Sequence, residues 1–238
     1  MRDVQIVPWN KKEELVISVD NSGGIGQKEG DIVFASYDIV SYFSFRVAVM
    51  ECIAAGGVPV SIVLQNFCGD HAWHQLVSGI HKGINELNLN SEIGITGSTE
   101  SNFSLQQSAV SLTIIGKRQA GTRELSISNG KIAVIGSPLV GEEVILQGER
   151  VVPLAIFMQL AKNNNYRIQP VGSKGILYEL GQLKGTLFKK EEVICSLDLL
   201  KSAGPATCFI VEYEKEEEEL KRIAGSYFHE VIITQRSN

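Results

Sequence analysis

Residues 44–67 read SFRVAVMECIAAGGVPVSIVLQNF and place an expected helix directly before an expected strand. The first part is rich in small and apolar residues and ends at the pair Gly56 and Gly57, which is typical of a helix C-terminus. The run from Val58 to Phe67 is apolar and rich in β-branched residues, which predicts a buried strand. This stretch therefore indicates a fold that mixes helices with sheet.

The rest of the chain continues this mixture of elements. The clearest helix spans residues 73–87, where apolar side chains recur at helical spacing and Asp70 is placed to cap the start. Further strands are predicted at 15–20, 31–36, 92–96, 108–117, 131–137, 206–213 and 230–235, and further helices at 151–163 and 174–183 and in the acidic segment near residue 217. The polar stretch 117–130 predicts a boundary between two domains, residues 1–118 and 119–238.

Composition excludes several classes of protein. The chain has 238 residues, of which 44% are hydrophobic and 21% charged, as in ordinary globular proteins. Its net charge of −5 and the lack of a basic stripe argue against a nucleic-acid partner. The sequence contains no apolar run long enough to span a membrane and no signal-peptide pattern at its start. The four cysteines form no CxxC pair, so we expect reduced thiols in a cytoplasmic protein.

A glycine-rich stretch, VDNSGGIGQK at residues 19–28, suggests a phosphate-binding loop but matches neither of the best-known motifs. A P-loop requires Ser or Thr after its lysine, whereas Lys28 is followed by Glu29. A dinucleotide fingerprint requires a third glycine where Glu29 stands. Both motifs also require a helix to follow at once. The next residues, 31–36, instead predict a strand.

The loop is followed by motifs in a characteristic order: YDIV at 37–40, MECIAAGGVPV at 50–60, QNFCGD at 65–70, HKGINELN at 81–88 and ITGSTESN at 95–102. This order and spacing resemble the PurM-like superfamily of aminoimidazole ribonucleotide synthetase, thiamine-monophosphate kinase and selenophosphate synthetase. The resemblance is specific over residues 15–118 and looser up to the C-terminus.

The resemblance implies an α+β protein of two domains. In that architecture the N-terminal domain is a mixed β-sheet with helices on one face, binds ATP and pairs into a homodimer, and a smaller C-terminal α/β sandwich domain follows. It also implies an enzyme that uses ATP with Mg²⁺ and acts on a small molecule, because phosphoryl transfer depends on positioning and on neutralising phosphate charge.

The resemblance also assigns roles to residues. It implies that carboxylates bind the metal. It also implies that glycines, amides, hydroxyls and the loop lysine bind the ATP phosphates. Asp38 and Asp70 are the candidates for orienting the acceptor hydroxyl. The metal candidates are Asp20, Asp38, Glu51 and Glu100, and the ATP or phosphate candidates are Gly23, Gly24, Gly26, Lys28, Asn66, Gly97, Ser98 and Thr99.

Two departures from the superfamily pattern affect these assignments. The loop is longer by Asn21, Ser22 and one glycine, which changes its contacts with phosphate. Ser98 stands where an acid is usual, so either Glu100 replaces that acid or one metal ligand is missing.

Among the branches, the motifs resemble most the α-ribazole kinase type of cobalamin salvage, which implies transfer of the γ-phosphate of ATP to α-ribazole. Two alternatives remain open at this point. One is an ATP-dependent synthetase or cyclo-ligase of the same superfamily, and the other is an ATP-binding module without catalysis.

Two further features have both a functional and a simpler interpretation. Cys68, Asp70, His71 and His74 could form a transition-metal site or include a catalytic thiol, but no second pair of ligands accompanies them. The acidic run at 214–220 could be an interaction tail, but Leu220 and Ile223 continue an apolar pattern that predicts a solvated helix.

Overall fold

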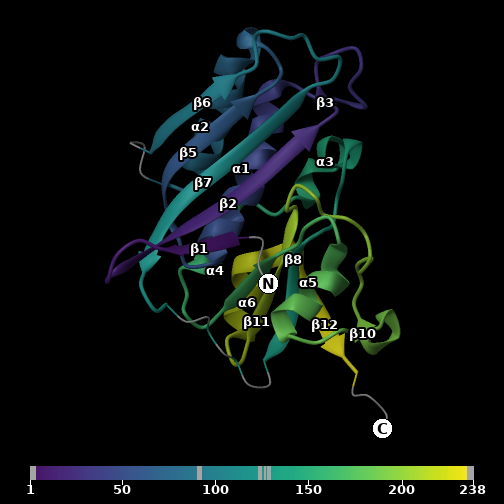
Figure 1. Cartoon of the computed structure of the whole chain (residues 1–238). Helices are drawn as coiled ribbons and strands as arrows, with labels where there is room; N and C mark the ends of the chain where they lie inside the picture. The colour runs from purple at the N-terminus through teal and green to yellow at the C-terminus, as the bar shows by residue number, and fades with distance from the viewer. Residues whose placement is uncertain (1–3, 90–92, 123–124, 126, 128–129, 235–238) are drawn as a thin grey trace. The chain divides into compact units, whose positions relative to one another are not determined.

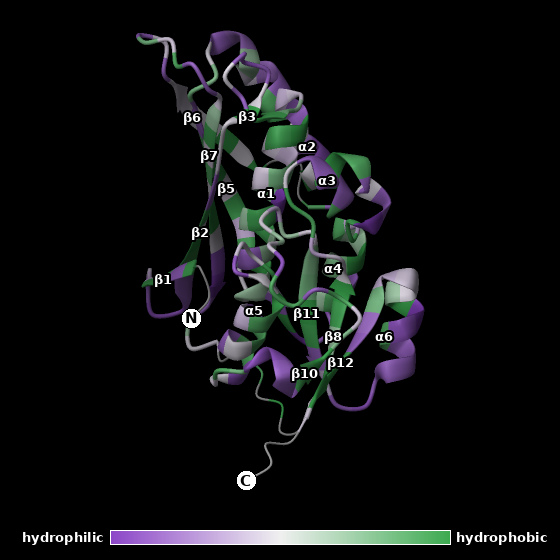
Figure 2. Ribbon diagram, turned by 90° about the vertical axis from the view of Figure 1, so that its right-hand side faces the viewer, coloured by the Kyte–Doolittle hydropathy of each residue, from purple (hydrophilic) through white to green (hydrophobic). Residues whose placement is uncertain are grey.

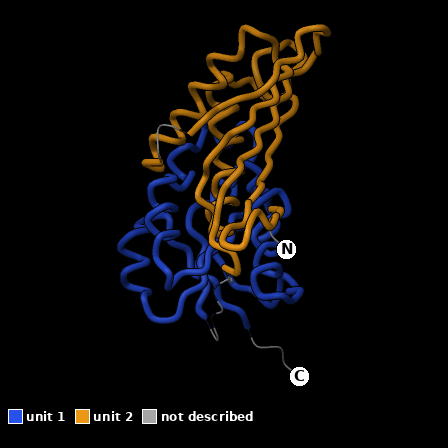
Figure 3. The backbone as a smooth tube through the Cα atoms, turned by 60° about the vertical axis from the view of Figure 1, so that its left-hand side comes forward, with its two compact units in different colours: residues 1, 123–238 blue, residues 2–122 orange. Residues whose placement is uncertain are grey.

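The computed structural model describes residues 4–89, 93–122, 125, 127 and 130–234 (Figure 1). The chain divides into two compact units, coloured separately in Figure 3: an N-terminal unit of residues 2–122 and a C-terminal unit of residues 123–238 together with residue 1. The expected division between residues 118 and 119 lies inside strand β7 (Ala109–Gln119), which belongs entirely to the N-terminal unit.

The N-terminal unit contains a five-stranded sheet in the order β1-β2-β7-β5-β6. Its long central pair, β2 (Glu13–Gly23) and β7, is antiparallel and runs in register from Glu13 opposite Gln119 to Gly23 opposite Ala109. The antiparallel pairs β1–β2 and β5–β7 and the parallel pair β5–β6 complete the sheet, with β1 at Val4–Pro8, β5 at Val58–Asn66 and β6 at Gly94–Thr99. The sheet is therefore mixed, as expected.

Helices α1 (Tyr37–Ala54) and α2 (Trp73–Glu86) pack on one face of this sheet, which Figure 2 shows nearly edge-on. Side chains alternate between the faces of a strand, and the buried Ser18 of β2 donates a hydrogen bond to the carbonyl of Ala48 in α1, at 2.7 Å. Val19 therefore lies on the opposite face, where 51% of it is exposed. Within the described N-terminal unit, no helix covers that face.

The two helices approach closely because α2 presents glycines to α1. A Cβ on Gly79 would lie 2.0 Å from the carbonyl oxygen of Asp38, and one on Gly83 would lie 2.3 Å from the Phe45 ring. The apolar face predicted for α2 is buried, with Leu76, Ile80 and Ile84 almost fully enclosed.

Three local expectations were wrong. Helix α1 begins at Tyr37 rather than near residue 44, and the strand expected at 31–36 is reduced to β4 (Val33–Phe34). Asp70 does not cap α2: it opens a 3-10 turn (Asp70–Ala72) that runs directly into the helix, whose cap position is Ala72 without a side-chain cap. Because the 3-10 turn supplies the preceding backbone, α2 has no separate capping side chain.

The C-terminal unit contains a second five-stranded sheet, in the order β10-β12-β8-β11-β9. All of its pairs are antiparallel, and its central strands β8 and β11 are largely buried and hydrophobic (Figure 2). The bounds are Lys131–Gly136 for β8, Arg167–Pro170 for β9, Val193–Ile194 for β10, Cys208–Tyr213 for β11 and Phe228–Ile233 for β12.

Helices cover both faces of this sheet. On one face α5 (Gly175–Lys184) packs its Ile176 and Leu180 with Ile210 of β11. On the other face Phe157 of α4 (Leu154–Ala161) meets the Phe209 ring edge-on, with centroids 5.3 Å apart. The remaining helices are α3 (Glu142–Leu146) and α6 (Glu217–Ala224).

The acidic run is the solvated helix that its pattern predicted. Leu220 of α6 is fully buried, whereas Glu218 and Glu219 are exposed. Among the residues that the structure describes, no helix is both long and apolar enough to cross a membrane.

Candidate nucleotide-binding loop

The glycine-rich stretch forms a compact loop that is fastened to the start of β7. A short strand β3 (Ile25–Gly26) pairs in parallel with β4. The Gly24 N–H donates to the carbonyl of Ser108 at 2.8 Å, and the Gly24 carbonyl accepts from the N–H of Ile32 at 2.7 Å. The Ala35 N–H donates to the carbonyl of Gly26 at 2.9 Å, which leads the chain into α1.

Two of the loop glycines are required by this close packing. Gly24 has a positive φ of 70°, a conformation that strains residues with a Cβ. A Cβ on Gly26 would lie 2.3 Å from Ser108 Oγ, so no larger residue fits. Gly23 is exposed and a Cβ there would meet nothing within 4 Å. Gly24 and Gly26 are thus fixed by packing, and Gly23 is the one of the three open to a ligand.

Asp31, which the motif comparison did not single out, organises the loop. Its carboxylate accepts hydrogen bonds from the Ser108 N–H and Ser108 Oγ, both at 2.7 Å, and from the Lys28 N–H at 2.9 Å. Desolvation raises the pKa of this carboxyl, but the bonds from Ser108 and Lys28 outweigh it and the net pKa is lowered. A turn lies at Glu29 and Gly30, and the glycine followed by Asp31 is the sequence signal that could have indicated it.

Lys28 directs its ammonium toward three backbone carbonyls. Its Nζ donates to the carbonyls of Phe67 and Leu105, both at 3.0 Å, and to that of Gln107 at 3.4 Å. A contact with phosphate would require Lys28 to give up at least one of these bonds, because an ammonium has three donors.

Asp20 lies on the helix-covered face of β2 and meets Ser44 of α1. Desolvation raises the pKa of the Asp20 carboxyl to about 7, although hydrogen bonds from the Ser44 side chain and the Asn21 backbone lower it. A carboxylate that loses hydration in this way gains from a nearby cation.

The four proposed metal ligands do not all gather at one point. Asp38 and Glu51 lie near opposite ends of α1, about 20 Å apart along its axis at the usual rise per residue. Glu100 accepts from the N–H groups of Asn102 and Phe103, at 2.7 and 3.2 Å, and so closes its own turn. Among the described residues, no group of three or more His, Cys, Asp or Glu side chains could hold a metal ion. The four carboxylates therefore do not fit a shared Mg²⁺ site.

Asn66 and Thr99 brace the ends of two neighbouring strands. The Asn66 amide nitrogen donates to the Gly69 carbonyl at 2.9 Å and to Thr99 Oγ at 3.1 Å, and its oxygen accepts from the Cys68 N–H at 2.8 Å. Both the nitrogen and the oxygen of the Asn66 side-chain amide are engaged in these bonds, and the residue is almost fully buried. A Cβ on Gly97 would lie 1.9 Å from the Leu64 carbonyl, whereas Ser98 is exposed.

The segment with Cys68, His71 and His74 does not form a metal site of the kind considered, since no such cluster exists in the described part of the chain. Cys68 is buried, and desolvation raises the pKa of its thiol although bonds from Ser108 and Ala109 lower it. A thiol with a raised pKa is a poor nucleophile near neutral pH. Asp70 is exposed at the first residue of the 3-10 turn.

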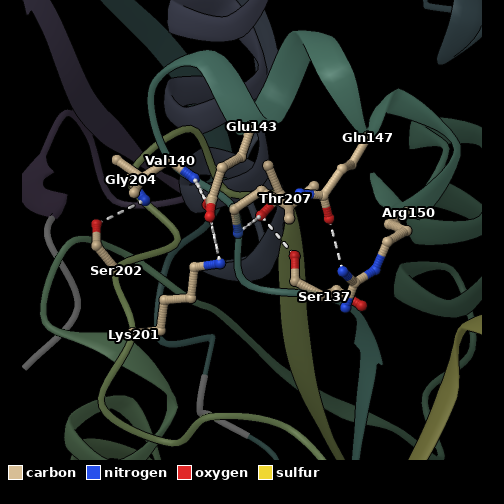
Figure 4. A network of polar contacts seen from close by, with 10 residues as sticks. Ser137, Val140, Glu143, Gln147, Arg150, Lys201, Ser202, Gly204 and Thr207 are labelled. Atoms are coloured by element: carbon tan, nitrogen blue, oxygen red, sulfur yellow. Dashed lines mark hydrogen bonds and ion pairs between the residues drawn. The ribbon is translucent and has the colours of Figure 1, made fainter.

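A second polar network lies in the C-terminal unit, between the segment that follows β8 and the one that precedes β11 (Figure 4). Thr207 Oγ donates to the Ser137 carbonyl at 2.8 Å and accepts from the Leu139 N–H at 3.0 Å. Lys201 forms an ion pair with Glu143 at 2.8 Å. These groups bond mainly to one another, so the network holds two loops together.

No protein-family model matches the sequence, and no curated protein matches it. Solved structures do match, and they show that the chain has a PurM-like fold. Thiamine monophosphate kinase from Aquifex aeolicus matches with a TM-score of 0.59 and 12% identity, over 99% of this chain and 89% of that chain. The protein tt0281 from Thermus thermophilus matches with a TM-score of 0.62 and 13% identity, over 98% and 87%.

PurL from Thermotoga maritima, in its complex with ADP, matches with a TM-score of 0.60 and 13% identity, over 99% of this chain but 42% of that chain. The chain thus spans well under half of PurL and most of the thiamine monophosphate kinase. At these identities the likeness establishes the fold, and the activity has to be argued from the residues.

Proposed function

We propose that this protein is an ATP-dependent small-molecule kinase that uses Mg²⁺ and phosphorylates α-ribazole. The observation that carries the proposal is the match in fold, nearly end to end, with a chain that is itself a small-molecule kinase. PurL, which shares the fold, has been solved in complexes with ADP and ATP. The motif order of residues 15–118 supports the same class.

In this proposal ATP lies at the glycine-rich loop, with its phosphates near Gly23 and the exposed end of β6 at Ser98. Mg²⁺ would arrive with the nucleotide and neutralise phosphate charge. It keeps several waters and needs only one or two protein carboxylates, of which Asp20 and Asp38 are the candidates. Glu51 and Glu100 are less suited, since Glu51 lies at the far end of α1 and Glu100 closes a turn.

The acceptor would meet an apolar surface beside the loop. Ile32, Phe34 and Phe103 are 81%, 73% and 76% exposed, and they come from the two segments that Lys28 and Gln107 join by hydrogen bonds. Exposed aromatic side chains can stack on a planar base such as that of α-ribazole. Asp38, in the first turn of α1, and Asp70 are the candidates for orienting the acceptor hydroxyl.

The direct test offers γ-labelled ATP with α-ribazole and, separately, with thiamine monophosphate. We expect label on α-ribazole, little on thiamine monophosphate, and no transfer without Mg²⁺. Folded protein that transfers no label to α-ribazole would rule out that acceptor. Release of ADP together with free phosphate, and an acceptor without label, would instead indicate the synthetase class.

A second candidate function is a nucleotide-binding module without catalysis. The observation that favours it is the dispersion of Asp20, Asp38, Glu51 and Glu100, which leaves no cluster of three carboxylates in the described residues. Calorimetry separates the two functions, because a module binds ATP tightly but leaves it intact with every acceptor offered.

We further propose that the N-terminal units of two copies pair through the sheet face that bears Val19. On that face the register aligns Val19 with Thr113 and Val63 across β2, β7 and β5, and α1 and α2 lie on the opposite side. Val19 is exposed and Thr113 and Val63 are partly exposed, and apolar surface left open on a sheet is suited to association.

A further inference from the structure

The ammonium of Lys28 occupies a position lined by main-chain oxygens. Its three acceptors are the carbonyls of Phe67, which follows β5, and of Leu105 and Gln107, which precede β7. The loop, the turn after β5 and the segment before β7 are far apart in sequence. One cation therefore links three separate segments of the N-terminal unit.

The backbone of the same residue is fixed independently of its side chain. The Lys28 N–H donates to the Asp31 carboxylate, and its carbonyl accepts from the Asp31 N–H at 3.0 Å. Asp31 in turn holds Ser108 through two hydrogen bonds. The side chain is thus anchored at its base, and its length sets where the ammonium meets the carbonyls.

We infer that Lys28 is a positioning residue, a built-in cation that clamps the glycine-rich loop, and that it does not hold phosphate. Backbone carbonyls that converge on one point are also how proteins replace the hydration shell of a potassium ion. The clamp would fix the spacing between the loop and the turn after β5, which Asn66 holds through the Cys68 N–H. It would also hold the apolar segment around Phe103 beside the loop.

The test compares full-length Lys28→Ala, Lys28→Arg and wild-type protein. The control is Lys11→Ala, because Lys11 is an exposed lysine of the same unit. Thermal unfolding is measured in sodium chloride, in potassium chloride and in n-propylammonium chloride at equal ionic strength. Propylammonium replaces the atoms that alanine lacks, so it can enter the vacated position and restore the bonds.

We expect Lys28→Ala to lower Tm by at least about 4 °C. Propylammonium should recover about half of that loss or more, and should leave wild type and Lys11→Ala unchanged. Lys28→Arg should also lower Tm, because a planar guanidinium does not place one charge among three carbonyls as an ammonium does. ADP affinity should fall less than tenfold in Lys28→Ala and should recover with the amine.

The opposite pattern would overturn the inference: unchanged Tm in Lys28→Ala, no effect of the amine, and ADP affinity lost by a hundredfold but kept in Lys28→Arg. The unfolding measurements need no nucleotide, so they remain decisive if the proposed ATP binding fails. If Lys28→Ala does not fold, Lys28→Arg decides: equal stability with wild type would overturn the clamp.

Discussion

At the scale of single residues, Asp31 shows how one carboxylate can fix a loop. Its partner Ser108 stands 77 positions later in the chain, at the start of β7. Its hydrogen bonds to Ser108 and Lys28 overcome desolvation and lower its pKa in the folded state. The charged form of Asp31 is therefore favoured by folding.

Replacing Asp31 by Asn should destabilise the protein by about 1–3 kcal/mol near pH 7, because charge-assisted bonds become neutral ones and one acceptor is lost. The folded-state pKa lies below the unfolded value of about 4, so the contribution is complete above that value and disappears as pH falls through the folded pKa. Urea unfolding at several pH values measures this. A difference between wild type and Asp31→Asn that stays constant down to about pH 3 would contradict the role.

Thr207 joins two segments of the C-terminal unit in a similar way. Its fully buried hydroxyl donates to the Ser137 carbonyl and accepts from the Leu139 N–H. Thr207→Val keeps the shape but leaves a buried carbonyl and a buried N–H without this partner, so we expect a loss of about 1–3 kcal/mol. Thr207→Ser, which keeps the hydroxyl, is the matched control in denaturant unfolding. Equal losses in both variants would show that the methyl group, and not the hydroxyl, matters.

At the scale of elements, the spacing of α1 and α2 is set by small residues on α2. Gly79 lies against the backbone of Asp38, and Gly83 lies against the ring of Phe45. Since α1 carries Ser44 beside Asp20 and begins beside the loop, the packing of the two helices also positions the proposed site.

Gly79→Ala should therefore cost about 1–3 kcal/mol, because a Cβ would overlap the Asp38 carbonyl and force the helices apart. Gly94→Ala, in β6 of the same unit, is the control, because a Cβ there meets nothing within 4 Å. Thermal unfolding compares the two. A Gly79→Ala protein as stable as Gly94→Ala would show that the helices can separate without penalty.

At the scale of the whole molecule, the N-terminal sheet has helices on one face and the row of Val19, Thr113 and Val63 on the other. If two copies pair through this face, a charge introduced into the row will be buried without a partner and will oppose association. Val19 is the most direct position to alter, because half of it is exposed in the single chain.

We expect wild type to be a dimer by light scattering and Val19→Arg to be a monomer with unchanged helix content by circular dichroism. Lys11→Arg, a change at an exposed residue that keeps the charge, should remain dimeric. A Val19→Arg protein that stays dimeric would place the interface elsewhere. A monomeric wild type would remove the pairing proposal altogether.

The sequence by itself determined the elements whose signals are local. The periodicity of Leu76, Ile80 and Ile84 predicted the extent of α2 to within one residue, and the β-branched run after Gly57 predicted β5. The order of motifs also indicated the PurM-like fold that the structural matches support. These features depend on neighbours within a few turns or on residue order, which one sequence displays directly.

Only the tertiary structure decided how the loop is held. The expected strand at 31–36 is reduced to Val33–Phe34. The glycine-rich loop bonds to this segment, and both Gly24 and Asp31 bond to Ser108, which is distant in the sequence. The motif predicted that Lys28 binds phosphate. In the structure its ammonium donates to three carbonyls from residues that are far from it in the sequence. Likewise, the spacing along α1 separates Asp38 from Glu51, because helix geometry and not residue type fixes which carboxylates can meet.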